Sequence, residues 1–168
     1  NIFDPNHIFN AGKITGTPAM DTHLRVQQKP VTRKVQTTFD FSSTEGILRL
    51  AEKCSGSGDC RKMPVSGGVM CPSYMATRLE RDATRARANV LRQFLSNELD
   101  GQPFNHKEIK EIMDLCLSCK GCKTECPSGV DVAKMKAEFL QQYYDKNGVP
   151  FRANLIANFS KQMKLISL

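Results

Sequence analysis

Apolar residues recur every three or four positions along most of the chain after residue 43, which is the spacing of one face of an α-helix. After Pro72 the pattern predicts one long helix with an inner face of Leu79, Ala83, Ala86, Val90 and Phe94. Further helices are expected over 44–54, after Cys126-Pro127, after Pro150 and from Asn105 to Cys116, where Glu108 would form a capping box with Asn105. The helix after Cys126-Pro127 should carry an apolar stripe and end at Gly148; the stripe consists of Val132, Met135, Phe139 and Tyr143. The alternation typical of a strand occurs only at Val35–Phe41, so the sequence predicts an all-α fold.

The helical region is organised as two similar halves, 44–97 and 105–146. Each half reads as a helix, a cysteine loop, a Cys-Pro pair and a second helix, which is a weak internal repeat. Residues 1–43 are interrupted by Pro and Gly and show little periodicity. We therefore expect a tail and linker over 1–43, one helical domain over 44–150 and a C-terminal helix over 151–168.

The second half contains the pattern C-x2-C-x2-C-x3-C-P, formed by Cys116, Cys119, Cys122 and Cys126-Pro127. Two-residue gaps let a tight loop place three thiolates at three corners of one 4Fe-4S cubane, and Gly121 lets the backbone approach closely. In two-cluster ferredoxins the fourth cysteine, before the proline, binds the other cluster. Zinc sites instead pair two C-x2-C knuckles around one ion, so this pattern favours iron–sulfur clusters.

The first half carries a degraded copy of that pattern. Cys54 and Cys60 take its first and third positions, and Ser57 stands where the second cysteine would be. Cys71-Pro72 matches Cys126-Pro127 as the crossing ligand.

If the cysteine before each proline binds the cluster of the other half, the sequence predicts two cluster sites with different numbers of thiolate ligands. The robust site is a 4Fe-4S cluster held by Cys71, Cys116, Cys119 and Cys122. The other site has only three thiolates, from Cys54, Cys60 and Cys126, with the Ser57 hydroxyl as a weak ligand. We expect this second site to be vacant or to hold a labile 3Fe-4S or 4Fe-4S cluster.

Charge and composition narrow the functional classes. The 168 residues carry a net charge of +7, but the positive charges are dispersed and Trp is absent, so we expect no nucleic-acid partner. Seven cysteines without a secretory signal favour reduced, metal-binding thiols in a cytoplasmic protein. No apolar run predicts a transmembrane segment, which leaves peripheral membrane association open. The start without Met and the end within an apolar pattern indicate a piece of a larger protein.

Several segments resemble one family. The stretch from Cys54 to Arg87 is similar to the iron–sulfur region of large FAD-linked oxidoreductases of the D-lactate, glycolate and D-2-hydroxyglutarate dehydrogenase type, in which C-x-G-x-G-x-C-R precedes G-x-M-C-P-S-Y and an Arg-rich helix. The second cysteine run and KAEFL at 136–140 resemble it as well. DPNHIFNAGK at 4–13 resembles the D-P-x(n)-N-P-G-K ending of the FAD-linked oxidase C-terminal domain, with Ala11 in place of the usual Pro.

This resemblance implies an α-helical ferredoxin fold and an electron-transfer function. Single electrons would pass from FAD, reduced by a 2-hydroxy acid, through the iron–sulfur module to an acceptor. The FAD is expected in a preceding flavin domain of the same polypeptide, and a downstream cysteine-rich reductase domain is a candidate acceptor. We find no nucleophile, acid–base pair or phosphate loop, so we expect the chain alone to be non-catalytic and the parent to be the dehydrogenase.

Two alternatives stay open. Iron–sulfur subunits of heterodisulfide reductase or succinate dehydrogenase type share the expected fold, although the segment 4–13 favours a fused flavin domain. A zinc-stabilised interaction module that binds an acidic partner is the alternative from another class. The stripe of Arg78, Arg81, Arg85 and Arg87 fits either docking to an acidic partner or a solvated helix face with local ion pairs.

Overall fold

The computed structural model describes residues 2–9, 11–14, 16–24, 35–96 and 104–166, with side chains up to residue 163. The chain divides into two compact units, 1–32 and 33–168. The described part of the first unit consists of turns. One of these turns is held by the Asp4 carboxylate, which accepts the N–H groups of Ile8 at 2.8 Å and Phe9 at 2.9 Å. The boundaries expected at residues 43 and 150 stay a prediction.

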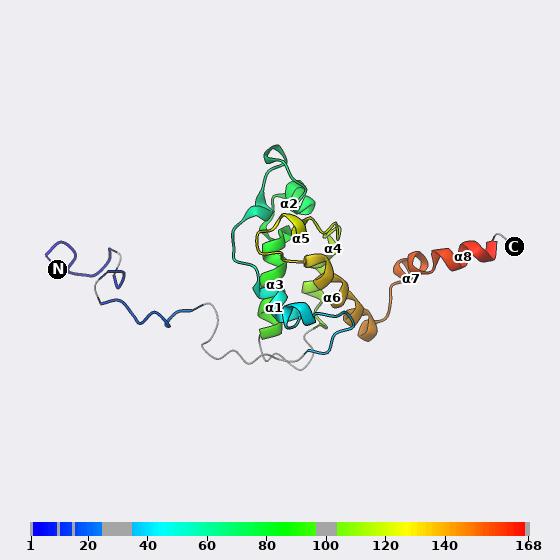
Figure 1. Ribbon diagram of the computed structural model, residues 1–168, viewed down its shortest axis with the longest axis horizontal. Helices are drawn as coiled ribbons and strands as arrows, with labels where there is room; N and C mark the ends of the chain where they lie inside the picture. The colour runs from blue at the N-terminus through cyan, green and yellow to red at the C-terminus, as the bar shows by residue number, and fades with distance from the viewer. Residues whose placement is uncertain (1, 10, 15, 25–34, 97–103, 167–168) are drawn as a thin grey trace. The chain divides into compact units, whose positions relative to one another are not determined.

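The second unit is helical, and the described residues contain no strand, which confirms the all-α class. Figure 1 shows its α-helices: α1 (Ile47–Glu52), α2 (Pro72–Thr77), α3 (Thr84–Ser96), α4 (Lys107–Asp114), α5 (Gly121–Glu125), α6 (Val132–Asn147), α7 (Phe151–Ala157) and α8 (Phe159–Ile166). None of the described helices is long and apolar enough to cross a membrane.

The core forms where α1, α3, α4 and α6 contact one another (Figure 1). Its fully buried members include Ile47, Leu91, Ile109, Met113 and Phe139. On α6 the expected stripe is confirmed, since Val132, Met135 and Phe139 are buried and Tyr143 packs, partly buried, against the core. Asp131 caps this helix by accepting the N–H of Lys134 at 3.0 Å, and Gly148 ends it.

The expected strand at Val35–Phe41 is wrong, and a buried carboxylate explains why. Glu138 on α6 is fully buried and accepts the N–H groups of Thr38 at 3.0 Å and Phe39 at 2.9 Å. Gln142, one turn further along α6, donates to the carbonyl of Gln36 at 2.7 Å. These side chains take the place of the neighbouring strand that the backbone of an extended segment otherwise requires.

The long helix expected after Pro72 is also wrong, because the chain breaks between α2 and α3. Arg78 ends α2 in the left-handed conformation with φ 61°, and Leu79 is extended and half exposed. The Thr77 hydroxyl accepts the N–H of Leu79 at 3.2 Å and donates to the carboxylate of Asp82 at 2.7 Å. The break moves the buried face of the following helix, which consists of Thr84, Arg87, Ala88, Leu91 and Leu95.

The remaining helix predictions differ in detail. The expected capping box at Asn105 and Glu108 is wrong, since His106 is the N-cap of α4 and no side chain caps it. The last expected helix is divided at Asn158 into α7 and α8.

Candidate metal centre

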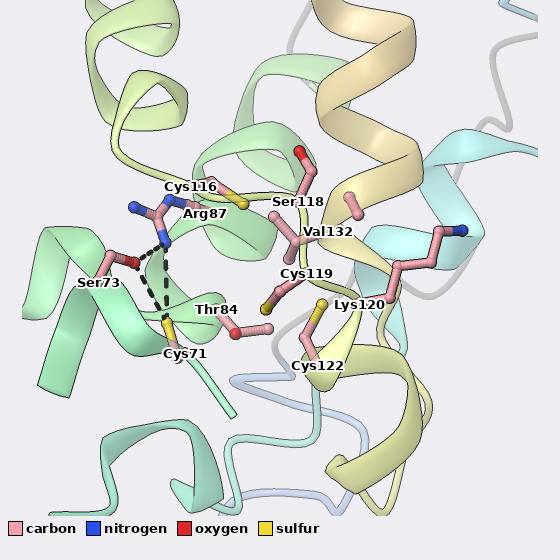
Figure 2. A pocket seen from close by; sticks show the side chains of 11 residues that line it. Cys71, Ser73, Thr84, Arg87, Cys116, Ser118, Cys119, Lys120, Cys122 and Val132 are labelled. Carbon is pink, nitrogen blue, oxygen red and sulfur yellow. Dashed lines mark hydrogen bonds between the residues drawn. The ribbon is translucent and has the colours of Figure 1, made fainter. Parts of the chain in front are cut away.

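Four cysteines from both halves of the chain line one pocket. Figure 2 shows Cys71 approaching from the start of α2, while Cys116 and Cys119 come from the loop before α5 and Cys122 from α5 itself. We call Cys71, Cys116, Cys119 and Cys122 the pocket set. Cys71 and Cys122 are buried, Cys116 is half-buried and Cys119 is exposed, so the pocket is closed on one side and reaches solvent on the other.

Three residues that line this pocket have a left-handed backbone. The φ angles are 60° at Cys71, 56° at Ser118 and 62° at Lys120. Such a conformation costs about 1–2 kcal/mol for a residue with a Cβ atom. Strain of this kind is concentrated at functional sites, because the surrounding structure has to hold it in place. The backbone around the pocket is therefore bent in a way that local preferences alone do not explain.

The N-terminus of α6 supports the thiol of Cys122. Burial raises the pKa of Cys122, whereas hydrogen bonds from the backbone N–H groups of Val132 and Ala133 act in the opposite direction. Nearby Asp131 and Cys116 raise this pKa further. Free N–H groups at a helix N-terminus stabilise a thiolate, so α6 favours the form of Cys122 that binds metal.

Two cationic side chains fix the edges of the pocket. Lys136 on α6 donates to the carbonyl of Cys116 at 2.6 Å and to that of Asp114 at 3.3 Å, which ties the start of the cysteine loop to α6. Burial lowers the pKa of Lys136, against a smaller opposing contribution from Cys116. Arg87 lines the pocket itself and is only 2% exposed, so for this residue both surface interpretations of the arginine stripe, docking and solvation, are wrong.

The remaining cysteines, Cys54, Cys60 and Cys126, are called the loop set. Cys54 and Cys60 are buried in the hydrophobic core, and Cys126 is half-buried against it. Burial raises the pKa of Cys60, while the N–H of Arg85, 3.4 Å from its sulfur, lowers it. Ser57, which replaces a cysteine in this set, is exposed.

Direct contacts join the cysteine loops of the two halves. The Ser128 hydroxyl donates to that of Ser55 at 3.1 Å, which brings the loop after Cys126 against the loop after Cys54. Glu125 accepts the N–H groups of Val69 at 2.7 Å and Met70 at 3.1 Å, immediately before Cys71.

Gly121 lies under the same junction. A Cβ atom there would stand 3.2 Å from the carbonyl oxygen of Val69 and 3.4 Å from the Cα of Met70. The close backbone approach that the sequence suggested at Gly121 is thus made to the other half of the protein.

The donor set fits an iron–sulfur centre. Thiolates are the ligands that hold such clusters, and the pocket places four thiols around one space. Over the described residues, no group of three or more His, Cys, Asp or Glu side chains converges closely enough for one metal ion. A cubane binds one thiolate at each of four irons, so its ligands surround a larger centre than a single ion.

Sequence reasoning missed several residues that build this centre. Ser73 and Asp82 contact Arg87 and Cys71, and Lys136 and Glu125 hold the cysteine loops. The signal for Arg87 was present, because it lies four residues before Leu91 and eight before Leu95, which are on the buried face of α3. Only the position of the helix start was needed to place it on the inner face.

Comparison with known proteins agrees with the helical fold and the cysteine-lined pocket. Residues 53–131, which include all seven cysteines, match the family model described as a 4Fe-4S dicluster domain. The match supports iron–sulfur clusters as the group that these cysteines hold. No solved structure matches the chain.

Its relatives define the larger context. The chain is 27% identical over 203 residues to D-2-hydroxyglutarate dehydrogenase of Escherichia coli and 27% over 191 residues to that of Pseudomonas putida, which covers 98% and 93% of the chain. It is 30% identical over 103 residues, or 61% of the chain, to the glycolate oxidase iron–sulfur subunit of Escherichia coli. The chain spans 19%, 18% and 22% of the length of these relatives, respectively. It is thus homologous to a part of each, and the resemblance found in the sequence is confirmed.

Proposed function

We propose that this chain is a one-electron relay in which the pocket set holds a robust 4Fe-4S cluster. The observation that carries the proposal is the pocket itself, where Cys71 from the first half stands with three thiols of the second half. When bound, such a cluster accepts and releases one electron at a time. The match of residues 53–131 to the dicluster domain family supports the same ligand chemistry.

Different residues around the pocket would stabilise the ligands, exclude water and leave the centre accessible to a partner. The N–H groups of Val132 and Ala133 stabilise Cys122 as a ligand, and Lys136 fixes the loop at Cys116. The buried side of the pocket excludes water, which influences the potential of a cluster. On the other side Cys119 is exposed, so a redox partner can approach the centre from there.

The parent protein is proposed to be an FAD-dependent 2-hydroxy acid dehydrogenase. Its reduced flavin, in a preceding domain of the same polypeptide, would deliver two electrons one at a time, and a downstream domain or separate acceptor would receive them. The names of the relatives and the resemblance of residues 4–13 to the end of a flavin domain support this proposal. The linker residues 36–39 are fastened to α6 by Glu138 and Gln142, which fixes the chain where it enters the cluster-bearing unit.

The loop set is proposed to hold a weaker second centre or none. Cys54, Cys60 and Cys126 supply three thiolates, and the exposed Ser57 would have to complete the set. An alkoxide is harder to form than a thiolate and is a poorer ligand for iron in this setting. A reducing compartment such as the cytoplasm keeps these thiols available for metal.

Anaerobic reconstitution of the chain with iron and sulfide tests the proposal. We expect a brown protein with broad absorbance near about 400 nm, the region typical of cysteine-bound iron centres. Iron and sulfide analysis should find at least one cluster per chain, and reduction should produce a paramagnetic signal. A colourless protein with stoichiometric zinc, prepared in the same way, would contradict the relay and support the zinc-stabilised interaction module.

A further inference from the structure

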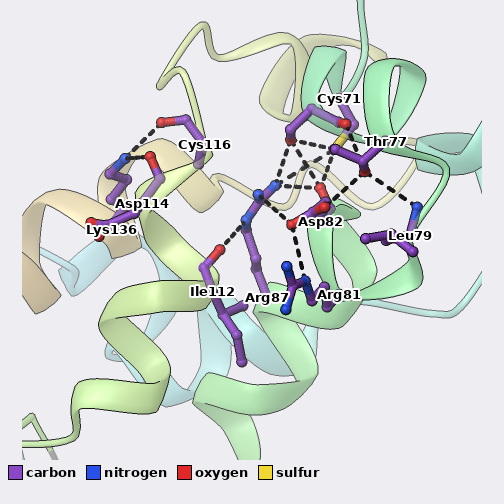
Figure 3. Close-up of polar contacts among 11 residues, drawn as sticks. Cys71, Thr77, Leu79, Arg81, Asp82, Arg87, Ile112, Asp114, Cys116 and Lys136 are labelled. Carbon is purple, nitrogen blue, oxygen red and sulfur yellow. Dashed lines mark hydrogen bonds and ion pairs between the residues drawn. The ribbon is translucent and has the colours of Figure 1, made fainter.

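Arg87 is a buried cation beside a proposed cluster ligand. Its Nη1 donates to the Ser73 hydroxyl at 2.9 Å and stands 3.8 Å from the sulfur of Cys71 (Figure 2). The same nitrogen donates to the Asp82 carbonyl at 2.5 Å (Figure 3). Its Nε donates to the carbonyl of Ile112 at 2.9 Å, as Figure 3 shows. The guanidinium is therefore held from α2, from the turn before α3 and from α4.

The contacts of Arg87 leave its charge incompletely neutralised. Its nearest carboxylate is that of Asp82, 3.9 Å from Nη2, and this nitrogen makes no hydrogen bond to the described residues. The same carboxylate accepts the Thr77 hydroxyl at 2.7 Å and lies 3.9 Å from Arg81 (Figure 3). A buried guanidinium is costly unless its charge is balanced. A negatively charged centre bound in the adjacent pocket would supply that balance.

Cys71 also needs new partners once it becomes a ligand. As a thiol it donates to the carbonyl of Asp82 at 3.1 Å. Metal binding removes that proton, and a thiolate can only accept hydrogen bonds. The donors near its sulfur are Nη1 of Arg87 and, at 3.7 Å, the hydroxyl of Ser73.

We propose that Arg87 is a positioning residue that raises the reduction potential of the centre held by the pocket set. The inference rests on the proposed function. Four thiolates make the loaded centre strongly anionic, and each added electron increases the negative charge. A buried cation and N–H···S contacts favour the reduced form, since net charge and hydrogen bonds to sulfur help to set cluster potentials. Little solvent screens this interaction, because Arg87 is 2% exposed.

Arg85, two residues earlier on α3, lies in a different environment from Arg87. The Arg85 side chain pairs with Glu80 at 2.7 Å and is 29% exposed. Its backbone N–H lies 3.4 Å from the sulfur of Cys60, and its charge is partly neutralised by Glu80 at the surface. The two arginines thus lie near different cysteine sets, but only Arg87 places its charge in a pocket.

A redox titration of the anaerobically reconstituted chain, followed by electron paramagnetic resonance, tests the proposal. The variants are Arg87→Gln, Arg87→Lys and Ser73→Ala. Arg81→Gln is the matched control, because it removes the same charge from a side chain that is 73% exposed. We expect Arg87→Gln to weaken the electron affinity of the centre at least tenfold, which is about 59 mV for one electron. Arg87→Lys and Ser73→Ala should cause smaller shifts in the same direction, and Arg81→Gln should leave the potential unchanged.

Two results would overturn the proposal. The first is a potential that Arg87→Gln leaves within the error of the unmodified chain while the cluster is intact. The second is loss of the cluster in both Arg87 variants under conditions where Ser73→Ala retains it, which would make Arg87 a folding residue. Failure of the proposed function is distinct, because the unmodified chain would then bind no iron and sulfide at all.

Discussion

The pocket set and the loop set occupy one helical unit, but their surroundings differ. Around the pocket set, Arg87 and Asp82 are buried as an ion pair, and Lys136 holds the loop at Cys116. Around the loop set, Arg85 and Glu80 pair at the surface, where Glu80 is 48% exposed and also meets Arg61. The pocket set has four thiols, whereas the loop set has three and the exposed Ser57.

This difference indicates that two copies of one motif can take different roles. Both sets contain a buried thiol with a raised pKa, Cys122 in one and Cys60 in the other. Thiol burial therefore does not distinguish them. They differ in ligand number and in whether the nearby arginine is buried, which are the properties that control cluster retention and potential.

Ser57→Cys should have the largest effect on the difference in cluster binding between the two cysteine sets. This substitution gives the loop set a fourth thiolate, so reconstitution should yield roughly eight irons per chain, as two 4Fe-4S clusters contain. Iron and sulfide analysis before and after exposure to air measures the effect. Ser66→Cys, which adds a thiol outside the run, is the control and should not increase the iron content. If the unmodified chain already holds two equally air-stable clusters, the proposed weakness of the loop set is wrong.

The ion pairs beside the two sets should differ strongly in their effect on stability. Asp82→Ala leaves Arg87 buried without its carboxylate and should lower the free energy of unfolding by about 3–5 kcal/mol. Glu80→Ala removes an exposed partner of Arg85 and should cost only about 0.2–1 kcal/mol. Urea denaturation of the metal-free protein measures both values. Equal losses would show that the two environments are energetically alike.

A smaller loss in the free energy of unfolding is expected from a substitution at Gly121, where the two halves meet. Gly121→Ala places a methyl group 3.2 Å from the carbonyl oxygen of Val69, so a neighbouring backbone has to shift. Overpacking of this kind should cost about 1–3 kcal/mol. Lys123→Ala on the exposed side of α5 serves as the control and should stay within about 0.5 kcal/mol. Denaturation of both variants in parallel compares them, and no loss for Gly121→Ala would mean that the junction is loosely packed.

The smallest effect should be the response of the metal-free protein to alkaline pH. Burial raises the pKa values of Cys60 and Cys122 above the ordinary 9.0, so the folded state holds these protons more tightly than the unfolded state. The unfolded thiols ionise first, and the free energy of unfolding should therefore fall as the pH rises above 9. Cys60→Ser and Cys122→Ser should each reduce this dependence in urea denaturation series. A stability that increases above pH 9 would contradict the shared burial of the two thiols.

The sequence predicted the parts of the fold that depend on regular patterns. The buried stripe of α6 followed from helical spacing, and the glycine after it marked its end. The cysteine spacing predicted which thiols the structure places in one pocket, including Cys71 from the other half. As ligand assignments, however, these residues stay a prediction.

Tertiary contacts decided the parts that the sequence could not predict. The alternation at Val35–Phe41 suggested a strand, but Glu138, distant in sequence, satisfies its backbone. The left-handed turn at Arg78 divides the helix expected after Pro72 and shifts the buried face of α3. The sequence therefore grouped Arg87 with the other arginines of a surface stripe, although its side chain lines the pocket. Propensity and spacing describe local preference, whereas these features depend on partners from other elements.

The most direct test of the central claim is the absorption spectrum of anaerobically reconstituted Cys71→Ser beside that of Cys126→Ser. Both substitutions replace a cysteine that precedes a proline, one in each half. If Cys71 binds the cluster of the Cys116–Cys122 loop, Cys71→Ser should lose most of the stable absorbance near about 400 nm, while Cys126→Ser should retain it. Retention of the full stable absorbance in Cys71→Ser would contradict the crossed arrangement.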